Sequence, residues 1–465
     1  MTLLTLMKKP NIEKDKRLNE KRYRKSLKRK KKKYVDLYYG RETTYSRQQR
    51  WSLNYDQKLI AEFDFDLNSF LAQKGYPEEV IFGKSEITIP KDFSLEKNLD
   101  GVFKKIKEIR LTIMQFSNEN ITLNFSKCKK VDFASLFLLR AILTEYIREL
   151  KKLDTRLLVL KTCPNIYVKT SDFEDVNLQL LACEMIPVAQ VQQSVLLPSS
   201  RTLFHRGSKS QSKYSENRKG TVATKMRGYV EECLKTHETL LTAQEKSDFD
   251  GIISEILNNA EDHSQFDTWY SYGNFFKTKK MENEEVIGEV NLAFMNFGYS
   301  IYDGILETKD KNIEQFNDLD ALRNFVKQKD KSNSFSDENI FTLYSLQDNI
   351  SRLRHTDKSR GTGTMTFIRS FMELGDYESK ELGYVPRLLI FSGKTIVRCD
   401  NQYKPFRKND RYFISLNQSE SLRDLPEKSH LINSKQYFPG TLLIVKMYLN
   451  REHLHKKIEN GTEKN

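Results

Sequence analysis

The sequence has no apolar run that approaches the roughly 18 residues of a bilayer-crossing helix, so no membrane span is expected. The short apolar stretch at its start is followed, rather than preceded, by Lys8 and Lys9, which is unlike a secretory signal peptide. Its five cysteines are scattered and form no CxxC pair, which argues against both a zinc site and a disulfide framework. Together these absences predict a protein of the reducing cytoplasm.

A complete P-loop is also absent, although Gly83-Lys84-Ser85 and Gly393-Lys394-Thr395 both end like one. The motif G-x-x-x-x-G-K-[ST] needs an earlier glycine, and the chain has Glu78 and Leu388 at those positions. A strand rather than a helix is also predicted after Thr395. These two segments are therefore not expected to hold phosphate.

Basic residues are concentrated in two short segments. The formal net charge of the chain is +14, of which residues 8–33 carry +12 and residues 201–220 carry +5. The rest of the chain therefore has a net charge of −3 and is close to neutral. Residues 8–33 could bind a polyanion such as nucleic acid, or could equally form a solvated tail.

Changes in composition divide the chain into five segments. Residues 1–50 are expected to form a basic, disordered arm, and residues 51–195 a first α/β domain. Residues 196–220 are rich in Ser, Lys, Arg and Gly and are predicted to be a linker. Residues 221–455 form the predicted second α/β domain, and residues 456–465 a short tail.

Hydrophobic periodicity predicts the main elements of both domains. In the first domain we expect helices at about 94–116 and 134–150 and strands at 121–125 and 156–160. In the second we expect helices at about 223–241, 247–263 and 364–374, and strands at 268–276, 286–296, 388–391, 395–399 and 442–448. The second of these helices is predicted to begin with a capping box formed by Ser247 and Asp250.

One predicted helix carries an unusual row of polar side chains. Glu255, Asn259 and His263 are spaced four residues apart, so they lie on nearly one helix face and drift by only about 40° per step. The neighbouring positions are apolar. Such a row needs a polar ligand to meet it, and a magnesium-bound triphosphate would serve. The alternative is an ordinary amphipathic helix whose polar face is solvated.

Three further segments follow this helix in a fixed order. An apolar strand runs into the polar turn Asn296-Phe297-Gly298-Tyr299-Ser300, and Arg360-Gly361-Thr362-Gly363-Thr364 leads into a helix. Phe438-Pro439-Gly440-Thr441 opens a final strand. Each motif is short, but four in this order form a more specific pattern than any one of them.

In these motifs, residues 221–450 resemble the GHKL superfamily of ATP-binding proteins, and the E-x-x-x-N-A-x-x-H pattern is most similar to the anti-sigma factor serine kinases. The resemblance implies a Bergerat-type two-layer α/β sandwich that binds ATP and Mg²⁺. It also implies that Asn259 holds the metal and that Glu255 is the catalytic base. The remaining nucleotide contacts implied are His263, Asn296, Gly298, Arg360, Gly361, Thr362, Gly363, Thr364 and Thr441.

Two positions depart from this family pattern. The family usually has Asp where this chain has Asn296, and Gly where it has Ser300. The Asp carboxylate accepts a hydrogen bond from the adenine amino group, whereas an amide can either accept or donate. We therefore expect looser base selectivity than in the relatives with Asp, with some guanine nucleotide tolerated.

The first domain resembles the STAS fold of anti-sigma factor antagonists. The residues that carry this resemblance are Ile121–Ser126 and Val131-Asp132-Phe133-Ala134-Ser135-Leu136. In the antagonists a serine after the Asp is phosphorylated by the partner kinase. Here Phe133 and Ala134 occupy the serine positions and Ser135 stands where Gly is expected, which argues against a phospho-switch.

The sequence thus predicts a slow ATPase, or a nucleotide-driven switch, coupled to a fused STAS-like domain. Residues 299–360 are the candidate lid whose movement would report nucleotide occupancy to that domain. One alternative is a protein serine kinase acting on a partner protein. Another is a non-catalytic module that binds a partner or nucleic acid and is stabilised by nucleotide. The oligomeric state stays open.

Overall fold

The computed structural model of the protein describes residues 86–115, 120–157, 166–186, 201–208, 218–279, 286–348, 350, 363–375, 377–381 and 383–462. The predicted basic arm at residues 1–50 lies outside this part of the chain. The described residues form mixed helices and strands, which confirms the α/β class.

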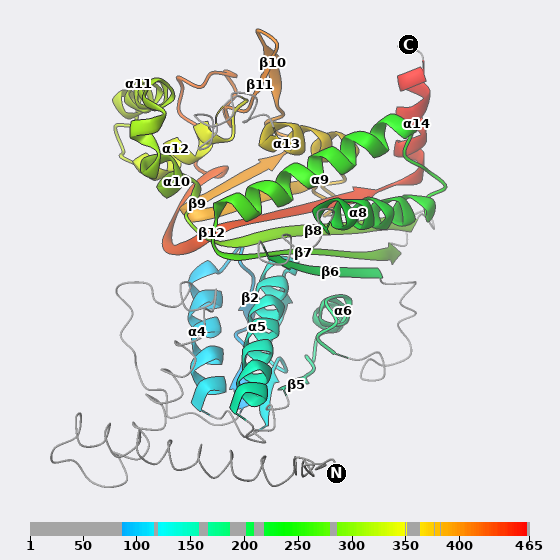
Figure 1. The fold of residues 1–465 in the computed structure, drawn as a ribbon. Coiled ribbons are helices and arrows are strands. Elements are labelled where there is room, and N and C mark those ends of the chain that lie inside the picture. The colour runs from blue at the N-terminus through cyan, green and yellow to red at the C-terminus, as the bar shows by residue number, and fades with distance from the viewer. Residues whose placement is uncertain are drawn as a thin grey trace, which may run out of the picture.

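A five-stranded antiparallel sheet forms the centre of the protein (Figure 1). Its order is β6-β7-β8-β12-β9, and its strands are β6 (Arg201–Ser208), β7 (Ser264–Lys279), β8 (Val286–Gly298), β12 (Leu431–Leu449) and β9 (Arg387–Asp400). The strands predicted at 268–276 and 286–296 are β7 and β8, which pair directly with each other. The sheet is buried on both faces, and most positions of the central strands β8 and β12 are apolar.

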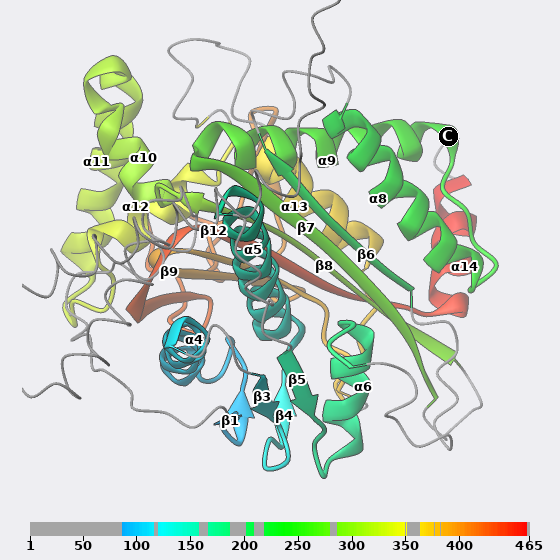
Figure 2. The same cartoon turned by 60° about the horizontal axis from the view of Figure 1, so that its bottom comes forward.

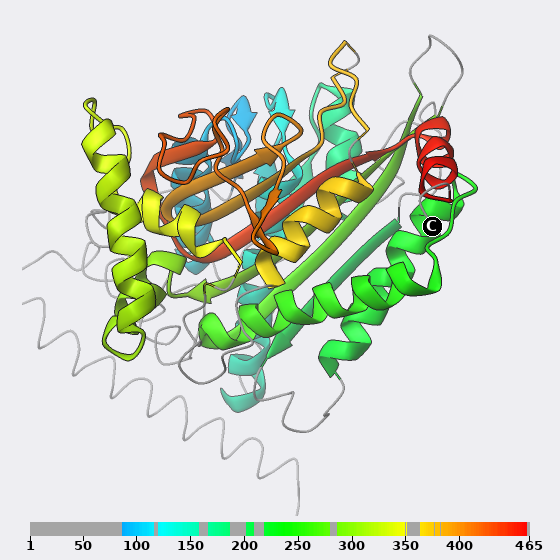
Figure 3. The same ribbon diagram turned by 90° about the horizontal axis from the view of Figure 1, so that it is seen from above.

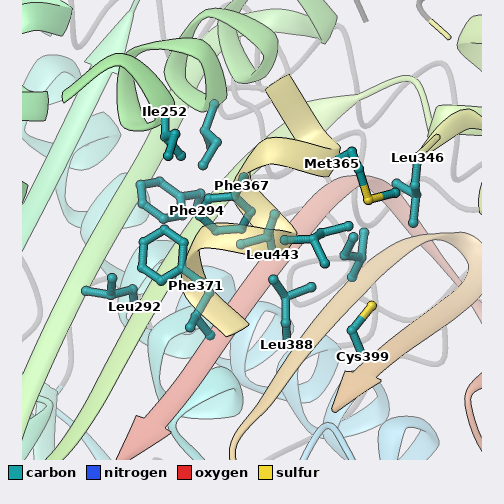
Figure 4. Close-up of a cluster of buried hydrophobic side chains, with 14 of the residues drawn as sticks. Ile252, Leu292, Phe294, Leu346, Met365, Phe367, Phe371, Leu388, Cys399 and Leu443 are labelled. Carbon is teal, nitrogen blue, oxygen red and sulfur yellow. The ribbon is translucent and has the colours of Figure 1, made fainter. Parts of the chain in front are cut away.

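Three helices cover one face of this sheet, above it in Figure 1. They are α8 (Arg218–Lys235), α9 (Ala243–His263) and α13 (Gly363–Leu374). Figure 4 shows Ile252 of α9, Phe294 of β8 and Phe367 of α13 within one cluster of buried apolar side chains. This core fixes α9 and α13 side by side over β8 and β12.

The opposite face of the sheet is covered by the upstream unit, residues 86–186 of the described chain (Figures 1 and 2). Its three parallel strands have the order β1-β3-β5, with β1 (Glu86–Thr88), β3 (Ile121–Asn124) and β5 (Ile166–Lys169). A second small sheet pairs β2 (Asp92–Phe93) with β4 (Lys130–Val131). The helices are α4 (Leu99–Gln115), α5 (Phe133–Leu157) and α6 (Glu174–Ala182).

The upstream unit and the five-stranded sheet share a hydrophobic core. Met295 and Phe297 point from β8 into this lower core, whereas Phe294 points into the upper one. This alternation follows from the two-residue period of a strand. At the junction the ring of Phe438 lies 6.3 Å from that of Phe103 in α4 and 6.1 Å from that of Phe297.

Polar contacts also join the two units. Arg206 of β6 forms an ion pair with the buried Glu145 of α5, and Arg140 of α5 donates to the hydroxyl of Tyr272 at 2.9 Å. Arg387 of β9 pairs with Glu96 of the upstream unit at 2.8 Å. Side chains from β6, β7 and β9 therefore fix the sheet onto the upstream unit.

The remaining described elements lie around the five-stranded sheet (Figure 3). These elements are α10 (Ile301–Glu307), the 3-10 helix η2 (Lys309–Lys311), α11 (Ile313–Lys329), α12 (Asp337–Ser345) and the hairpin of β10 (Phe406–Lys408) with β11 (Arg411–Phe413). The last helix, α14 (Arg451–Thr462), follows β12 and occupies most of the predicted tail.

Several local predictions were wrong. Residues 201–208, assigned to the linker, form the edge strand β6, and α8 begins at Arg218 within the same predicted linker. Arg156 and Leu157, predicted in a strand, end helix α5. The two strands predicted at 388–391 and 395–399 are one continuous strand, β9.

The start of α9 also differs from the prediction. The helix begins at Ala243, because Thr242 and Glu245 form the reciprocal side-chain-to-backbone bonds of a capping box. The predicted pair does not cap the helix. Asp250 instead accepts from the guanidinium of Arg227 in α8 at 3.0 Å, which joins α8 to α9.

Among the helices of the described residues, none has both the length and the apolar character that a bilayer crossing requires. The same residues contain no group of three or more His, Cys, Asp or Glu arranged to hold a metal ion. Four of the five cysteines are described, and all four are buried free thiols: Cys128, Cys183, Cys233 and Cys399. Cys163 lies outside the described residues.

Candidate functional site

Helix α9 turns two of its polar side chains toward a cavity. Ile253 and Leu257 are fully buried against the sheet, and the helical period places Glu255 and Asn259 on a neighbouring face. Both of these side chains line a cavity of about 140 Å³. At these two positions the polar row predicted on this helix therefore lines a partly open cavity.

The cavity lies between α9, α13, the sheet and the turn after β8. Its walls are largely apolar and come from segments far apart in the sequence. The apolar lining residues are Ile256, Ala260, Phe294, Met295, Ile301, Ile305, Leu346, Ile350, Phe367, Ile390 and Leu443. Figure 4 shows Phe294, Phe367 and Leu443 together in the core that continues from this wall. An apolar cavity with a few polar groups is the usual form of a small-molecule site.

The N-terminus of α13 opens onto the cavity next to Glu255. Gly363 is the first residue of this helix, and Gly363 and Thr364 both line the cavity. A Cβ atom on Gly363 would lie 2.0 Å from Cγ of Glu255, so only glycine fits while Glu255 keeps its place. Backbone N–H groups in the first turn of a helix have no partner within the helix and favour anions.

The sheet contributes Asn296 of β8 and Thr441 of β12, which are cross-strand partners. The backbone N–H of Thr441 donates to Oδ1 of Asn296 at 3.2 Å. Asn296 is only 2% exposed, and its Nδ2 atom has no hydrogen-bond partner. Among the described residues that line the cavity, this is the one buried side-chain nitrogen or oxygen left without a partner.

The backbone beside Asn296 has an unusual conformation. Gly440 has φ +125°, and a Cβ atom there would lie 2.1 Å from the carbonyl oxygen of Asn296. The pairing of β12 with β9 is irregular at this point. Ser392 of β9 stabilises the arrangement, because its Oγ donates to the Gly440 carbonyl at 3.0 Å and accepts from the backbone N–H of Ile301 at 2.8 Å.

Ser300 has a clear structural role at the position where the family resemblance would place glycine. It is the N-cap of α10, and its Oγ accepts from the backbone N–H of Asp303 at 3.1 Å. The same hydroxyl donates to the carboxylate of Asp303 at 2.7 Å. Ser300 therefore fixes the start of the helix that closes one side of the cavity.

Six of the residues predicted for the site line this one cavity: Glu255, Asn259, Asn296, Gly363, Thr364 and Thr441. Gly298 is not in the lining. It is the last residue of β8 and pairs with Ser264 at the start of β7. His263 ends α9, and its side chain is outside the described part of the structure. Arg360, Gly361 and Thr362 also lie outside the described residues.

Sequence analysis missed most of the cavity wall. Gly304 and Ile305 of α10, Leu346 after α12, and Ile390 of β9 belong to no motif. The one general signal in the sequence is the length of residues 299–360 between two site motifs. Nothing in that segment indicated which of its apolar residues turn inward.

The cavity has little charge of its own. Among the described lining residues, Glu255 is acidic and none is Lys or Arg. An anionic ligand would therefore depend on the N-terminus of α13 and on a bound cation for charge compensation. Glu255 and Asn259 offer hard oxygen donors on one helix, which fits Mg²⁺ if most of its ligands are phosphate oxygens and water.

Comparison with protein-family models, with curated proteins and with solved structures finds no match. The functional argument therefore depends on the cavity and on the residues that meet there.

Proposed function

We propose that the cavity binds a magnesium-bound nucleoside triphosphate of the ATP type in the GHKL manner, and that the protein is a slow ATPase or a nucleotide-driven switch. The observation that supports this most strongly is the convergence of Glu255, Asn259, Asn296, Gly363 and Thr441 on one cavity. These residues come from four motifs, and Glu255 and Thr441 lie 186 residues apart in the sequence. The layered arrangement of α8, α9 and α13 on an antiparallel sheet fits the Bergerat-type sandwich of that superfamily.

In this proposal different residues bind the metal ion, the phosphates, and the base and ribose. Asn259 would hold the magnesium ion through its side-chain oxygen, and the ion would neutralise charge on the phosphates. The first turn of α13, at Gly363 and Thr364, would bind phosphate oxygens through its backbone N–H groups. The apolar wall that includes Phe294 and Leu443 would cover the base and ribose and exclude water from them.

Glu255 is placed to act as the general base. It lines the cavity one helical turn before Asn259 and lies against Gly363 at the N-terminus of α13. A carboxylate between the metal ligand and the phosphate-binding turn can accept a proton from water or from a hydroxyl group that attacks the terminal phosphate. Whether the acceptor is water or a partner protein decides between the ATPase and the serine kinase.

The upstream unit supports a STAS-like assignment through its parallel sheet and the strand-turn-helix at Asp132. Ser135 is an unsuitable phosphate acceptor within this chain, because it is 0% exposed and its Oγ donates to the carbonyl of Phe93 at 2.7 Å. Ser135 is therefore not expected to be the residue that a kinase activity of this chain phosphorylates. Binding of nucleic acid through residues 8–33 is a separate prediction that does not involve the cavity.

Calorimetric titration with ATP tests the proposal directly. We expect Mg²⁺-dependent binding in the wild-type protein and a loss of the Mg²⁺ dependence in Asn259→Ala. Asn324→Ala is the matched control, because Asn324 is an exposed residue on α11 away from the cavity. It should bind as the wild type does. If Asn259→Ala kept full Mg²⁺-dependent binding, the proposed metal contact would be wrong.

Phosphate release and transfer of radiolabel then separate the activities. A Glu255→Gln variant that binds nucleotide but releases no phosphate would support the ATPase. Label that moves to a second protein would support the kinase. Binding without either reaction would support the non-catalytic module.

A further inference from the structure

The amide of Asn296 is held in one orientation. A backbone N–H can only donate a hydrogen bond, so the atom of Asn296 that faces the N–H of Thr441 must be the oxygen. Rotating the amide by half a turn would place two donors against each other. The oxygen of Asn296 is thus already engaged, and the amide cannot turn to accept from a ligand without losing this bond.

The other end of this amide is the NH₂ group, which is buried and has no partner. The two-residue period of a strand places Asn296 on the same face of β8 as Phe294, and both residues line the cavity. A buried donor without an acceptor is unfavourable, and such groups in folded proteins usually have a partner in a bound molecule or water. The structure therefore presents a fixed donor beside an apolar wall.

The other hydroxyls near this point have no proton left to donate to a ligand. The Oγ of Ser392 uses its one proton in the bond to the Gly440 carbonyl, so the hydroxyl of Thr441, 3.2 Å away, donates to Ser392. The Oγ of Ser300 already donates to Asp303 and accepts from its backbone. Among these residues, Asn296 is therefore the one whose donor group is still without a partner.

We propose that the cavity selects a 6-oxopurine nucleoside triphosphate, with inosine or guanosine as the nucleoside, over ATP. This inference rests on the proposed function, which places a nucleotide in the cavity. The amino group of adenine facing Asn296 would set one donor against another, whereas the carbonyl oxygen of a 6-oxopurine accepts the hydrogen bond. A site built to pair with one polar group rejects a ligand that leaves that site group unpaired.

The test uses three ligands that differ in the group at C6. The wild-type protein is titrated with ITP, with ATP and with purine riboside triphosphate, which has only hydrogen at C6, all in the presence of Mg²⁺. We expect ITP to bind at least about tenfold more tightly than ATP, with the unsubstituted purine between them. Equal affinities, or tighter binding of ATP, would overturn the inference and leave the proposed function standing.

A single substitution should reverse the preference. In Asn296→Asp one carboxylate oxygen still accepts from the N–H of Thr441, and the other becomes an acceptor for the amino group of adenine. ATP should then bind at least about tenfold more tightly than ITP. An unchanged order in the variant would contradict the role of Asn296, and the wild-type titration decides the matter even if the variant does not fold. Failure of every triphosphate to bind would overturn the proposed function itself.

Discussion

Replacing Phe438 with alanine tests whether the upstream unit and the sheet form one cooperative structure. Phe438 is 3% exposed and belongs to β12. Its ring is 6.1 Å from Phe297 of β8 in a stacked arrangement and 6.3 Å from Phe103 of α4. The substitution therefore removes a ring that contacts both units at once.

The expected loss in the free energy of unfolding follows from the burial of this ring. A buried Phe→Ala replacement destabilises a protein by about 3–5 kcal/mol, and each aromatic pair contributes about 0.5–1.5 kcal/mol beyond its buried area. At about 1.4 kcal/mol per factor of ten, the equilibrium constant for the unfolding that exposes this core should rise roughly 10²- to 10⁴-fold. Replacing Phe325, which is 40% exposed on α11, should change stability by only about 0.5 kcal/mol.

Buried thiols in the upstream unit and in the five-stranded sheet can report the unfolding of each part. Cys128 lies in the upstream unit and Cys399 in β9, and both are 0% exposed. Their rates of labelling by a thiol reagent, measured by mass spectrometry in dilute urea, follow the opening of the structure around them. We expect Phe438→Ala to accelerate both rates by the same factor. Faster labelling of Cys399 with Cys128 unchanged would refute the claim of a shared core.

Three further outcomes are expected. Glu145→Gln should lower the free energy of unfolding in urea by about 3 kcal/mol, because it removes the buried carboxylate that pairs with a guanidinium of β6; a change below about 1 kcal/mol would contradict this. Gly363→Ala should reduce phosphate release about 10²-fold with the fold retained, because its Cβ displaces Glu255; unchanged turnover would disprove the placement. Burial alone would raise the pKa of Asp400, but hydrogen bonds from His430 and the backbone of Gln402 lower it overall. The stability from this carboxylate should therefore be present above about pH 4 and lost as the pH falls further, so Asp400→Asn should show a shallower decline in Tm below pH 4 than the wild type.

The parts of the fold with a strong local pattern could be predicted from the sequence. Strands β7 and β8 and helix α13 lie close to their predicted ranges because their apolar periodicity is clear. The same is true of α9, except at its start. There the capping box is made by Thr242 rather than Ser247 because Glu245 is present three residues later.

The strand β6 could not be predicted because its stabilising partners are distant. Its sequence Arg201-Thr202-Leu203-Phe204-His205-Arg206 is basic and resembles a linker. In the fold, Leu203 and Phe204 pack against the two opposite cores, and Arg206 pairs with Glu145, 61 residues earlier. A charge that is neutralised by so distant a residue leaves no local signal.

Only the residues of the candidate site that belong to a sequence motif could be predicted. The motifs predicted Glu255, Asn259, Asn296 and Thr441, which line one cavity. The apolar wall was not predictable, since it is assembled from single residues of several elements. The orientation of Asn296 was also beyond the sequence, because it depends on the backbone N–H of a strand 145 residues later.

The central claim is that a metal-bound triphosphate occupies the cavity beside Asn259. A crystal structure of the protein grown with Mn²⁺ and a non-hydrolysable triphosphate tests it most directly, because the anomalous signal locates the metal. We predict a metal peak at roughly 2.1 Å from the side-chain oxygen of Asn259, with the phosphates at the first turn of α13. A metal and nucleotide bound elsewhere, or a cavity that stays without nucleotide at saturating concentration, would contradict the account.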